Sequence, residues 1–304
     1  MSFRPRKFKL RRVVPVQLLL YVLLRAVLMV ARMFPASAAV RGGRWIGRLL
    51  RLIDPTHRRV AVKNLERSRG VCAPDEIPEF VDRVYGNIGR TFVEMMMIPK
   101  LIDQLASLVR LERFHVVDEV RRRGKGMITV IGHLGNWELI GLAVCAAGHP
   151  LHSLARPIEN PWVDRYLHRF RTQTGQRIIS KYEALGEMIR VIRGNEILII
   201  QVDQDARKHG IYVDFFGRPA YTMTLAAKLA ERDNVACYLA FAKRLPRGEG
   251  YSITVRKLPE ARAGESATRR MNRALEELIA ECPEQYLWGY NRYKIPAGAE
   301  APPK

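Results

Sequence analysis

Short apolar runs alternate with helical patterns through most of the chain, and this alternation limits the fold more than any other feature. Six runs have the composition of buried strands: residues 127–131, 151–155, 197–201, 211–215, 235–242 and 251–257. Six segments have helical periodicity: residues 76–100, 136–147, 160–174, 182–194, 222–232 and 265–281. Strands that alternate with helices pair in parallel and are covered by helices on both faces. The sequence therefore predicts an α/β fold with a largely parallel central sheet flanked by helices.

The composition and the cysteine usage exclude several protein classes. A chain of 304 residues with 48% hydrophobic residues can bury a full core, which excludes wholesale disorder. Four cysteines lie far apart, with no CxxC pair and no histidine at metal-ligand spacing: Cys72, Cys145, Cys237 and Cys282. A disulfide scaffold or a zinc ribbon needs tighter grouping. We expect reduced thiols in a cytosol-facing protein.

Positive charge is concentrated in the N-terminal part of the chain. Residues 1–70 contain 17 of the 51 Lys and Arg residues but only two acidic residues, Asp54 and Glu66. The apolar run 13–34 follows six basic residues and is long enough to cross a bilayer. Arg25 stands in its centre, where an arginine costs about 2.5–3.5 kcal/mol on insertion scales. Residues 13–34 can therefore form either a helix that spans the membrane or a helix that lies in the membrane interface.

Residues 41–53 have the pattern of a basic amphipathic helix. Four arginines recur at spacings of three, four and three, which places them on one side: Arg41, Arg44, Arg48 and Arg51. Trp45 and aliphatic residues fill the other side. This pattern is typical of a helix in the headgroup layer of an anionic phospholipid membrane, and a helix packed on the domain with a solvated arginine face is the alternative. Nucleic acid is not expected as a partner, because aromatic residues for base stacking are few.

Three polar residues follow predicted strands at equivalent positions. His133, Arg156 and Asp203 each come within two residues of the end of such a strand. In open α/β sheets, ligands bind beyond the carboxyl ends of the strands. We therefore expect these three side chains to meet in one functional site.

His133 and Glu138 form an H-x-x-x-x-E motif in the stretch GHLGNWE. Removing a proton from a hydroxyl needs a base that works near neutral pH, and a carboxylate on the other imidazole nitrogen fixes the tautomer. Five residues of regular helix would turn the two side chains about 140° apart. We therefore expect His133 in a turn that Gly132 and Gly135 permit, before a helix capped by Asn136. Glu138 can then reach the imidazole from the first turns of that helix.

The stretch GHLGNWE resembles the HX4D/E block of the glycerolipid and lysophospholipid acyltransferases. The resemblance is closest to the bacterial lipid A biosynthesis (lauroyl/myristoyl) acyltransferase family. Further blocks follow in that family's order: ARPIENPW at 155–162, RTQTG at 171–175, DQDARKHGIYVDFFGRPAYT at 203–222 and PEQYLWGYNRYK at 283–294. The likeness runs from residue 59 to residue 294, and several ordered blocks do not match by chance.

The resemblance implies a one-step transfer of a fatty acyl chain from an acyl thioester to a hydroxyl of a membrane lipid. The donor is expected to be acyl carrier protein or acyl-CoA, and the leading acceptor is a lipid A precursor. No metal, cofactor or covalent acyl-enzyme is implied, which fits the absence of a G-x-S-x-G motif. By this resemblance His133 is the general base, Glu138 orients it, and Arg156 binds a phosphate of the donor or of the acceptor.

Further substrate-binding residues are expected in the third block. Asp203 and Asp205 follow a predicted buried strand and can pair with Arg156 or Arg218. Arg218 and Thr222 are expected to shape the acyl or acceptor pocket. Arg171 and Gly175 are assigned to structure, and the segment 288–294 either meets lipid phosphates or packs.

The expected organisation has three parts. Residues 1–58 form basic membrane-associating helices, residues 59–296 form the acyltransferase domain, and residues 297–304 form a disordered tail. The expected location is the bacterial inner (cytoplasmic) membrane, with the catalytic domain on the cytosolic side. Alternatives are the acylation of another lipid, such as a phosphatidylinositol mannoside or a lysophospholipid, and a non-catalytic lipid-binding protein of the same fold.

Overall fold

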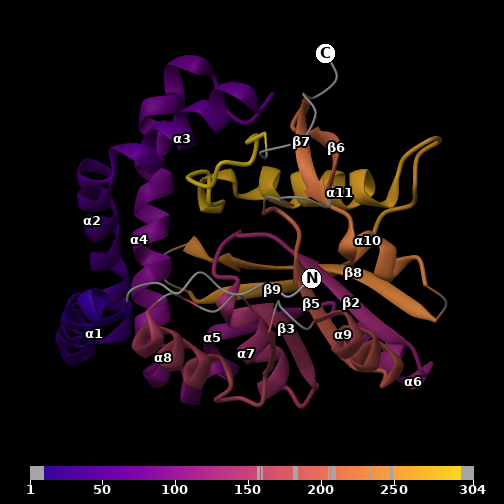
Figure 1. Cartoon of the computed structure of the whole chain (residues 1–304), viewed down its shortest axis with the longest axis horizontal. Coiled ribbons are helices and arrows are strands. Elements are labelled where there is room, and N and C mark those ends of the chain that lie inside the picture. The colour runs from indigo at the N-terminus through magenta and orange to yellow at the C-terminus, as the bar shows by residue number, and fades with distance from the viewer. Residues whose placement is uncertain are drawn as a thin grey trace.

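The computed structural model describes residues 10–155, 158, 160–180, 184–204, 206, 210–232, 234–246 and 249–295 (Figure 1). The helices are α1 Leu10–Met33, α2 Ala36–Ile53, α3 Pro55–Arg67, α4 Ile77–Leu101, α5 Leu105–Leu108, α6 His115–Arg122, α7 Glu138–Ala146, α8 Pro161–Arg171, α9 Ala184–Arg193, α10 Leu225–Ala230 and α11 Ala267–Glu281. The strands are β1 Val109–Glu112, β2 Gly126–Ile131, β3 Leu151–Ala155, β4 Arg177–Ser180, β5 Ile197–Gln201, β6 Gly210–Phe215, β7 Arg218–Met223, β8 Val235–Arg244 and β9 Tyr251–Lys257. Short 3-10 turns lie at Pro74–Glu76, Ile102–Gln104 and Pro283–Gln285.

A seven-stranded sheet forms the centre of the domain, in the order β1-β9-β8-β2-β5-β3-β4. Neighbouring strands pair in parallel except β8 with β9, which are antiparallel. β2 and β5 are neighbours, with Ile131 opposite Gln201, so their carboxyl ends lie together. The predicted α/β fold with a largely parallel central sheet is confirmed.

Two hydrophobic cores cover the two faces of the sheet. Ile128 and Val130 of β2 face one core, which contains α9, α10 and α11, while Met127 and Ile131 face the other, which contains α6, α7 and α8. Successive strand side chains point to opposite faces, so a continuous apolar run serves both cores. Helix α4 contributes to both cores and stands across the edge where β2 and β8 end (Figure 1).

The sheet differs from the predicted strand set at three places. The segment 211–215 is a strand, but it pairs with β7 in a separate antiparallel hairpin. Edge strands β1 and β4 were not predicted from the sequence, because four residues of mixed polarity give no buried-strand pattern. β7 takes the first part of the segment expected as helix 222–232, so α10 is shorter.

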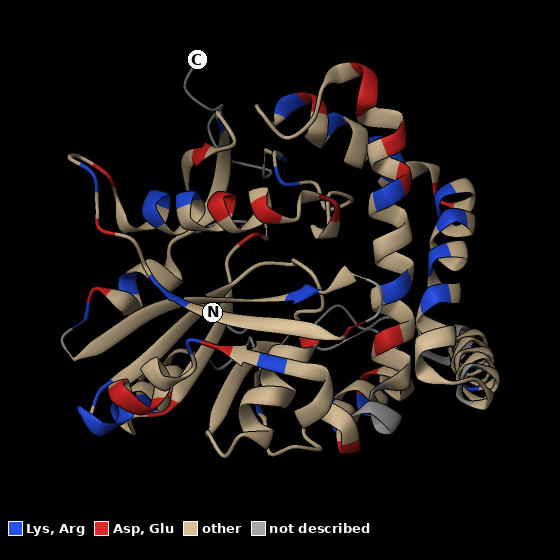
Figure 2. Cartoon of the chain, turned by 180° about the vertical axis from the view of Figure 1, so that it is seen from behind, with Lys and Arg blue, Asp and Glu red and all other residues tan. Residues whose placement is uncertain are grey.

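Glycines hold α2 against α4. Gly43 and Gly47 of α2 are buried, and a Cβ at Gly47 would overlap the Tyr85 carbonyl oxygen. Gly89 of α4 faces both glycines at similarly close range. Arg48 and Arg51 both pair with Asp82 of α4, at 3.0 and 3.3 Å. The basic helix α2 and helix α4 therefore lie side by side, as Figure 2 shows from behind.

The apolar side of α2 is exposed instead of forming core. Its exposed large side chains are Trp45, Ile46, Leu49, Leu52 and Ile53. Helix α1 also exposes many aliphatic side chains, although Leu28 is buried. Arg25 hydrogen-bonds the Tyr21 hydroxyl at 3.0 Å and lies near the ring of Tyr166 in α8. No helix among the described residues is long and apolar enough to cross a membrane.

The expected domain boundary at residues 58–59 falls inside α3, which runs from Pro55 to Arg67. Asn64 of α3 donates to the carbonyl oxygens of Trp288 and Tyr290 at 2.7 and 2.6 Å. This helix is therefore joined to the C-terminal segment of the catalytic domain. The tail expected at 297–304 lies outside the described residues.

Candidate active site

The turn after β2 places His133 at the carboxyl end of the sheet. Gly135 adopts φ +61°, and a Cβ there would overlap the Ala242 carbonyl oxygen, so glycine is needed at this position. Three backbone hydrogen bonds of 3.0 Å fix the turn: Gly135 N–H to Gln285 O, Asn136 N–H to Ala242 O, and Leu287 N–H to His133 O. The end of β8 and the C-terminal segment thus hold the turn rigidly.

The imidazole of His133 pairs with Asp203, which follows the neighbouring strand β5. Nδ1 of His133 lies 2.8 Å from Asp203 Oδ1, and the His133 backbone N–H donates to Oδ2 at 2.7 Å. Because the carboxylate accepts, Nδ1 carries the proton and Nε2 keeps its lone pair. The side-chain amides of Gln201 and Gln204 lie 3.2 and 3.3 Å from Nε2. Nε2 is therefore the ring atom that can act as a base.

Burial and charge act in opposite directions on this pair. Burial alone lowers the pKa of His133, but the Asp203 carboxylate and then Glu138 raise it, so it lies above the ordinary value. Burial alone raises the pKa of Asp203, but the imidazole, its hydrogen bonds and Arg292 hold that pKa below its ordinary value. A proton that Nε2 accepts is thus stabilised by the buried carboxylate.

Two buried residues of the C-terminal segment support Asp203. Burial raises the pKa of the Tyr286 phenol well above its ordinary value, and its hydrogen bond to Asp203 adds to this effect, so the phenol stays a donor. Arg292 is 3% exposed and lies over the Phe215 ring at 4.9 Å. Arg292 therefore packs beneath the site, which is one of the two roles expected for the segment 288–294.

Glu138 does not make the expected hydrogen bond to the imidazole. It begins α7 and accepts two hydrogen bonds from Arg171 of α8, from Nε at 2.9 Å and from Nη2 at 2.6 Å. Asp203 orients His133 instead, because β5 ends directly beside Nδ1. Glu138 acts on His133 through its charge.

The Glu138–Arg171 ion pair borders a small cavity whose lining includes two neighbours of His133, Trp137 and Gln201. This cavity of about 40 Å³ is lined by Glu138, Arg171, Trp137 and Gln201, together with apolar residues of β2, β3 and β5. Gln201 is also the residue that faces Nε2 of His133. The Trp137 ring meets the His133 ring edge-on, with centroids 4.9 Å apart. A reacting group beside Nε2 would therefore contact both amide and aromatic side chains.

Asn136 does not cap α7 as expected. The N-cap position is Trp137, which makes no side-chain capping bond. The Asn136 amide donates instead to Glu94 of α4 at 3.0 Å, and both side chains are fully buried. Glu94 also forms an ion pair with Arg244 at the end of β8. The turn at residues 132–136, which we call the catalytic turn, is thus held to α4 by a buried charge pair.

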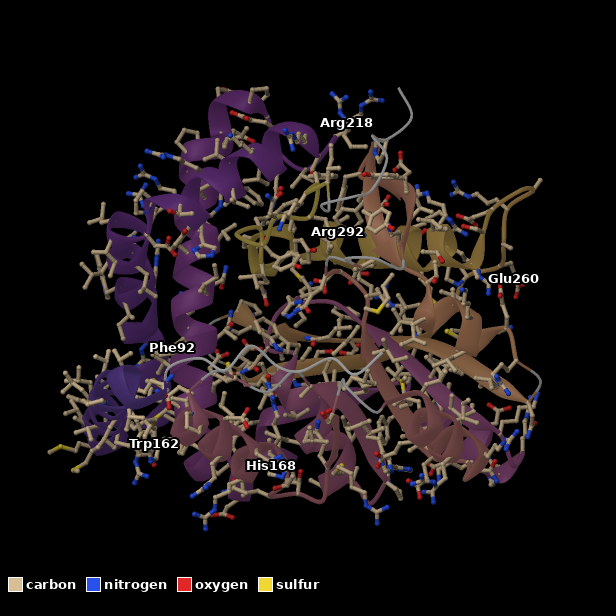
Figure 3. The ribbon with its side chains drawn as sticks, viewed as in Figure 1. Phe92, Trp162, His168, Arg218, Glu260 and Arg292 are labelled. Carbon is tan, nitrogen blue, oxygen red and sulfur yellow. The ribbon has the colours of Figure 1, made fainter. Side chains whose placement is uncertain are left out.

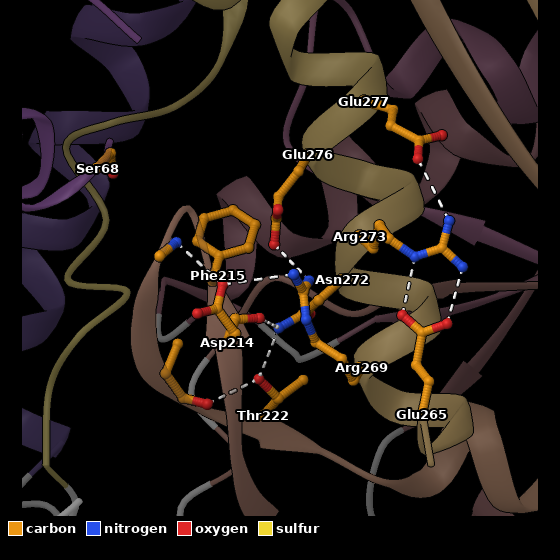
Figure 4. A network of polar contacts seen from close by, with 12 residues as sticks. Ser68, Asp214, Phe215, Thr222, Glu265, Arg269, Asn272, Arg273, Glu276 and Glu277 are labelled. Carbon is orange, nitrogen blue, oxygen red and sulfur yellow. Dashed lines mark hydrogen bonds and ion pairs between the residues drawn. The ribbon is translucent and has the colours of Figure 1, made fainter. Parts of the chain in front are cut away.

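The other predicted substrate-binding residues are placed differently. Arg156 and Asp205 lie outside the described residues. Arg218 is exposed at the start of β7, at the tip of the β6–β7 hairpin, where Figure 3 shows it far above the sheet. Thr222 is 1% exposed, and Asn272 binds its hydroxyl at 3.2 Å (Figure 4). Arg292 donates to the same hydroxyl at 2.7 Å. The structure brings together His133 and Asp203, with Glu138 beside them.

Sequence reasoning missed four residues that build this site. Arg171 and Tyr286 lie in the quoted blocks RTQTG and PEQYLWGYNRYK, and these blocks were the only signal for them. Glu94 and Arg244 lie outside every block, and their buried pairing has no sequence pattern. The described part of the chain has no cluster of three or more His, Cys, Asp or Glu residues that could hold a metal ion.

The structure thus combines an α/β domain with an imidazole–carboxylate pair at the strand ends, where ligands bind in open α/β sheets. The chain belongs to the bacterial lipid A biosynthesis acyltransferase family, whose family model matches residues 6–295. It is 23% identical over 285 residues to lipid A biosynthesis acyltransferase 2 of Shigella flexneri, which covers 89% of this chain and 88% of the relative. It is 23% identical over 269 residues to the lipid A biosynthesis lauroyltransferase of Escherichia coli, covering 86% of each chain. The predicted family is confirmed, and the protein is an acyltransferase.

A third relative carries a different acceptor in its name. The chain is 24% identical over 204 residues to a phosphatidylinositol mannoside acyltransferase of Mycobacterium tuberculosis, which covers 63% of each chain. Relatives of this chain are thus named for different lipids.

Proposed function

We propose that this enzyme transfers a fatty acyl chain from an acyl thioester to a hydroxyl of a lipid A precursor. The observation that carries the proposal is the His133–Asp203 pair at the sheet edge, in a chain whose relatives are named for lipid A acylation. The donor is acyl carrier protein or acyl-CoA. The chain's strongly basic N-terminal part suits a donor protein or membrane of negative charge.

In the proposed reaction His133 acts as a general base and then as a general acid. Nε2 takes the proton of the acceptor hydroxyl while the oxygen attacks the thioester carbonyl carbon. The tetrahedral intermediate collapses, the C–S bond breaks, and the imidazolium returns the proton to the thiolate. Asp203 holds the tautomer and stabilises the imidazolium, as carboxylates do in catalytic triads. Arg171 fixes Glu138, which adds a second negative charge near the ring.

The direct test is acyl transfer by the purified protein. A radiolabelled lipid A precursor and acyl carrier protein loaded with a fatty acid are incubated with the enzyme, and the product is identified by mass spectrometry. A new ester on the lipid A precursor supports the proposal. The second candidate acceptor is a phosphatidylinositol mannoside, because the mycobacterial relative is named for acylation of that lipid. Transfer to that lipid and not to the lipid A precursor would replace the proposed acceptor.

The pH dependence of kcat/KM tests the role of Asp203. Only neutral His133 can accept a proton, so activity rises with pH through a pKa that lies above the ordinary imidazole value. In Asp203→Asn the carboxylate that raises this pKa is gone, whereas burial still lowers it. The acidic limb therefore moves to lower pH, and kcat falls by about 10²–10⁴-fold because the tautomer is no longer fixed.

Asp103→Asn is the matched control, because Asp103 is exposed and far from the imidazole in the chain. Its profile should equal that of the wild type. An acidic limb that stays in place in Asp203→Asn would show that Asp203 does not set the pKa of the base.

We further propose that α1 and α2 attach the enzyme to the cytosolic face of the inner membrane. The support is the exposed apolar side of α2, beside arginines that suit anionic headgroups. Trp45 and Leu49 are 67% and 59% exposed. Burying each such side chain in the membrane interface contributes about 1.5–3 kcal/mol. Figure 2 shows the basic residues of α2 grouped along one helix.

The double substitution Trp45→Glu with Leu49→Glu should weaken binding to phosphatidylglycerol vesicles by about tenfold or more, given that energy per side chain. Sedimentation of the full chain with vesicles measures this. Ile211→Glu, at an apolar site 41% exposed on the β6–β7 hairpin, is the control and should bind like the wild type. Equal binding of the double variant would remove α2 from the membrane contact.

A further inference from the structure

A basic cleft of about 490 Å³ opens beside the catalytic turn, between α2, α4 and the end of β8. Its cationic lining consists of Arg44, Arg83, Arg90, Lys243 and Arg244, and its acidic lining consists of Glu281 and Glu284. It shares no lining residue with the cavity at Glu138 and Arg171. The mechanism above leaves this cleft unused.

Three of these cations have no acidic partner in the described part of the chain. Arg244 pairs with Glu94, Arg83 pairs with Glu79, and Glu281 pairs with Arg256. No ion pair or hydrogen bond is made by the side chains of the remaining three among the described residues: Arg44, Arg90 and Lys243. The cleft therefore keeps an excess of positive charge, and Glu284 is its one lining carboxylate without an ion pair in the described part of the chain.

The position of Arg90 makes this excess costly in the empty enzyme. Arg90 is half-buried, and burial, then Arg244 and Arg44, lower its pKa, while Glu94 opposes them. A half-buried guanidinium among like charges is relieved when an anion enters. Guanidinium groups bind phosphate oxygens in pairs of parallel hydrogen bonds, and a lysine adds a point charge.

The cleft connects to the base through one residue. Gln285 lines the cleft, and its backbone oxygen accepts the Gly135 N–H of the catalytic turn. The same Gln285 also lines a cavity of about 130 Å³ whose walls are nearly all apolar, including Phe92, Met95 and Trp137. Trp137 in turn touches the His133 ring. A basic cleft, an apolar cavity and the base thus follow one another along the surface.

We infer that this cleft binds a phosphate group on the headgroup of the acceptor lipid, through Arg44, Arg90 and Lys243. The inference rests on the proposed function, because it requires a lipid acceptor. A phosphate carried by a lipid fits the cleft better than a free phosphate does. Arg44 of the cleft is followed directly by Trp45, which belongs to the exposed apolar side of α2. A headgroup phosphate in the cleft would anchor the acceptor while its hydroxyl reaches Nε2 of His133.

The kinetic test compares a phosphorylated lipid A precursor with the same lipid after phosphatase treatment. In the wild type, loss of the phosphate should raise the acceptor KM by about tenfold, the worth of one or two charge-assisted hydrogen bonds. In the double variant Arg90→Gln with Lys243→Gln, the KM for the phosphorylated lipid should rise by a similar factor, and phosphatase treatment should change nothing further. The donor KM should stay constant. A raised donor KM, or an unchanged preference for the phosphorylated acceptor, would overturn the inference.

Arg193→Gln is the matched control, because it removes from α9 one exposed charge that has no ion pair among the described residues. Arg44→Gln is a second variant at an exposed position, for use if the double variant is unstable. Retention on phosphatidylcholine vesicles with and without phosphatidic acid gives a readout that needs no catalysis. If the wild type transfers no acyl chain but the double variant loses the phosphatidic-acid-dependent retention, the proposed function fails and the phosphate site stands. If transfer is normal and retention equals that of the wild type, the phosphate site fails alone.

Discussion

Replacing His133 with alanine should abolish acyl transfer while the protein stays folded. No other group in the described site offers a free lone pair beside the reacting position, because Asp203 is bound by His133 and Glu138 is bound by Arg171. General-base catalysis by a positioned imidazole contributes about 10²–10⁴-fold, so kcat should fall by at least that much. The acceptor KM should change little, because the imidazole contributes to proton transfer more than to binding.

The stability of this variant separates the chemical role from a structural one. Asp203 keeps Tyr286 and Arg292 as partners when the imidazole is gone, so the buried carboxylate is not left alone. His168→Ala is the control, since His168 is exposed and its side chain has no partner among the described residues. Mass spectrometry of the product and the unfolding temperature are measured on the same preparations. Wild-type activity in purified His133→Ala would exclude the proposed mechanism.

The central sheet could be predicted from the sequence because its buried strands are continuous apolar runs. β2 and β5 are buried on both faces. Their sequences therefore do not alternate between apolar and polar residues, as a half-exposed strand would. Edge strand β4 has only four residues, of which one is buried, and so short a run gives no pattern that distinguishes it from a loop. The strand at 211–215 was recognised, but its partner was not, because a strand's own residues do not say which sheet it joins.

The sequence could predict only those site residues that directly follow a strand. His133 and Asp203 follow neighbouring strands, and the rule for open α/β sheets brings them together. Which carboxylate meets the imidazole depends on the side from which it arrives, and spacing along one turn does not determine this. Glu138 was therefore assigned the contact that Asp203 makes. Partners that come from distant helices, such as Arg171, cannot be found from a motif alone.

Removing the Glu94 carboxylate should cause a large loss of stability. Glu94 is 0% exposed and binds the Arg244 guanidinium and the Asn136 amide, while Arg244 also donates to Asn87 and Thr91 of α4. Burial alone would lower the pKa of Arg244, but Glu94 raises it above its ordinary value, so Arg244 stays charged. Glu94→Ala would leave that buried charge without its partner, which costs about 3–5 kcal/mol. A loss of this size lowers Tm by about 10 °C in a domain of this length.

The double variant Glu94→Met with Arg244→Met distinguishes a coupled pair from two independent packing contacts. Removing both charges leaves no unpaired ion, so the double variant should be more stable than the sum of the two single losses predicts, by about 1–3 kcal/mol. Losses that simply add would show that the two charges do not depend on each other. Because Asn136 belongs to the catalytic turn, Glu94→Ala should also lower kcat at temperatures where it is still folded. Asp82→Ala, which breaks partly exposed ion pairs between α2 and α4, is the comparison and should cost no more than about 1 kcal/mol.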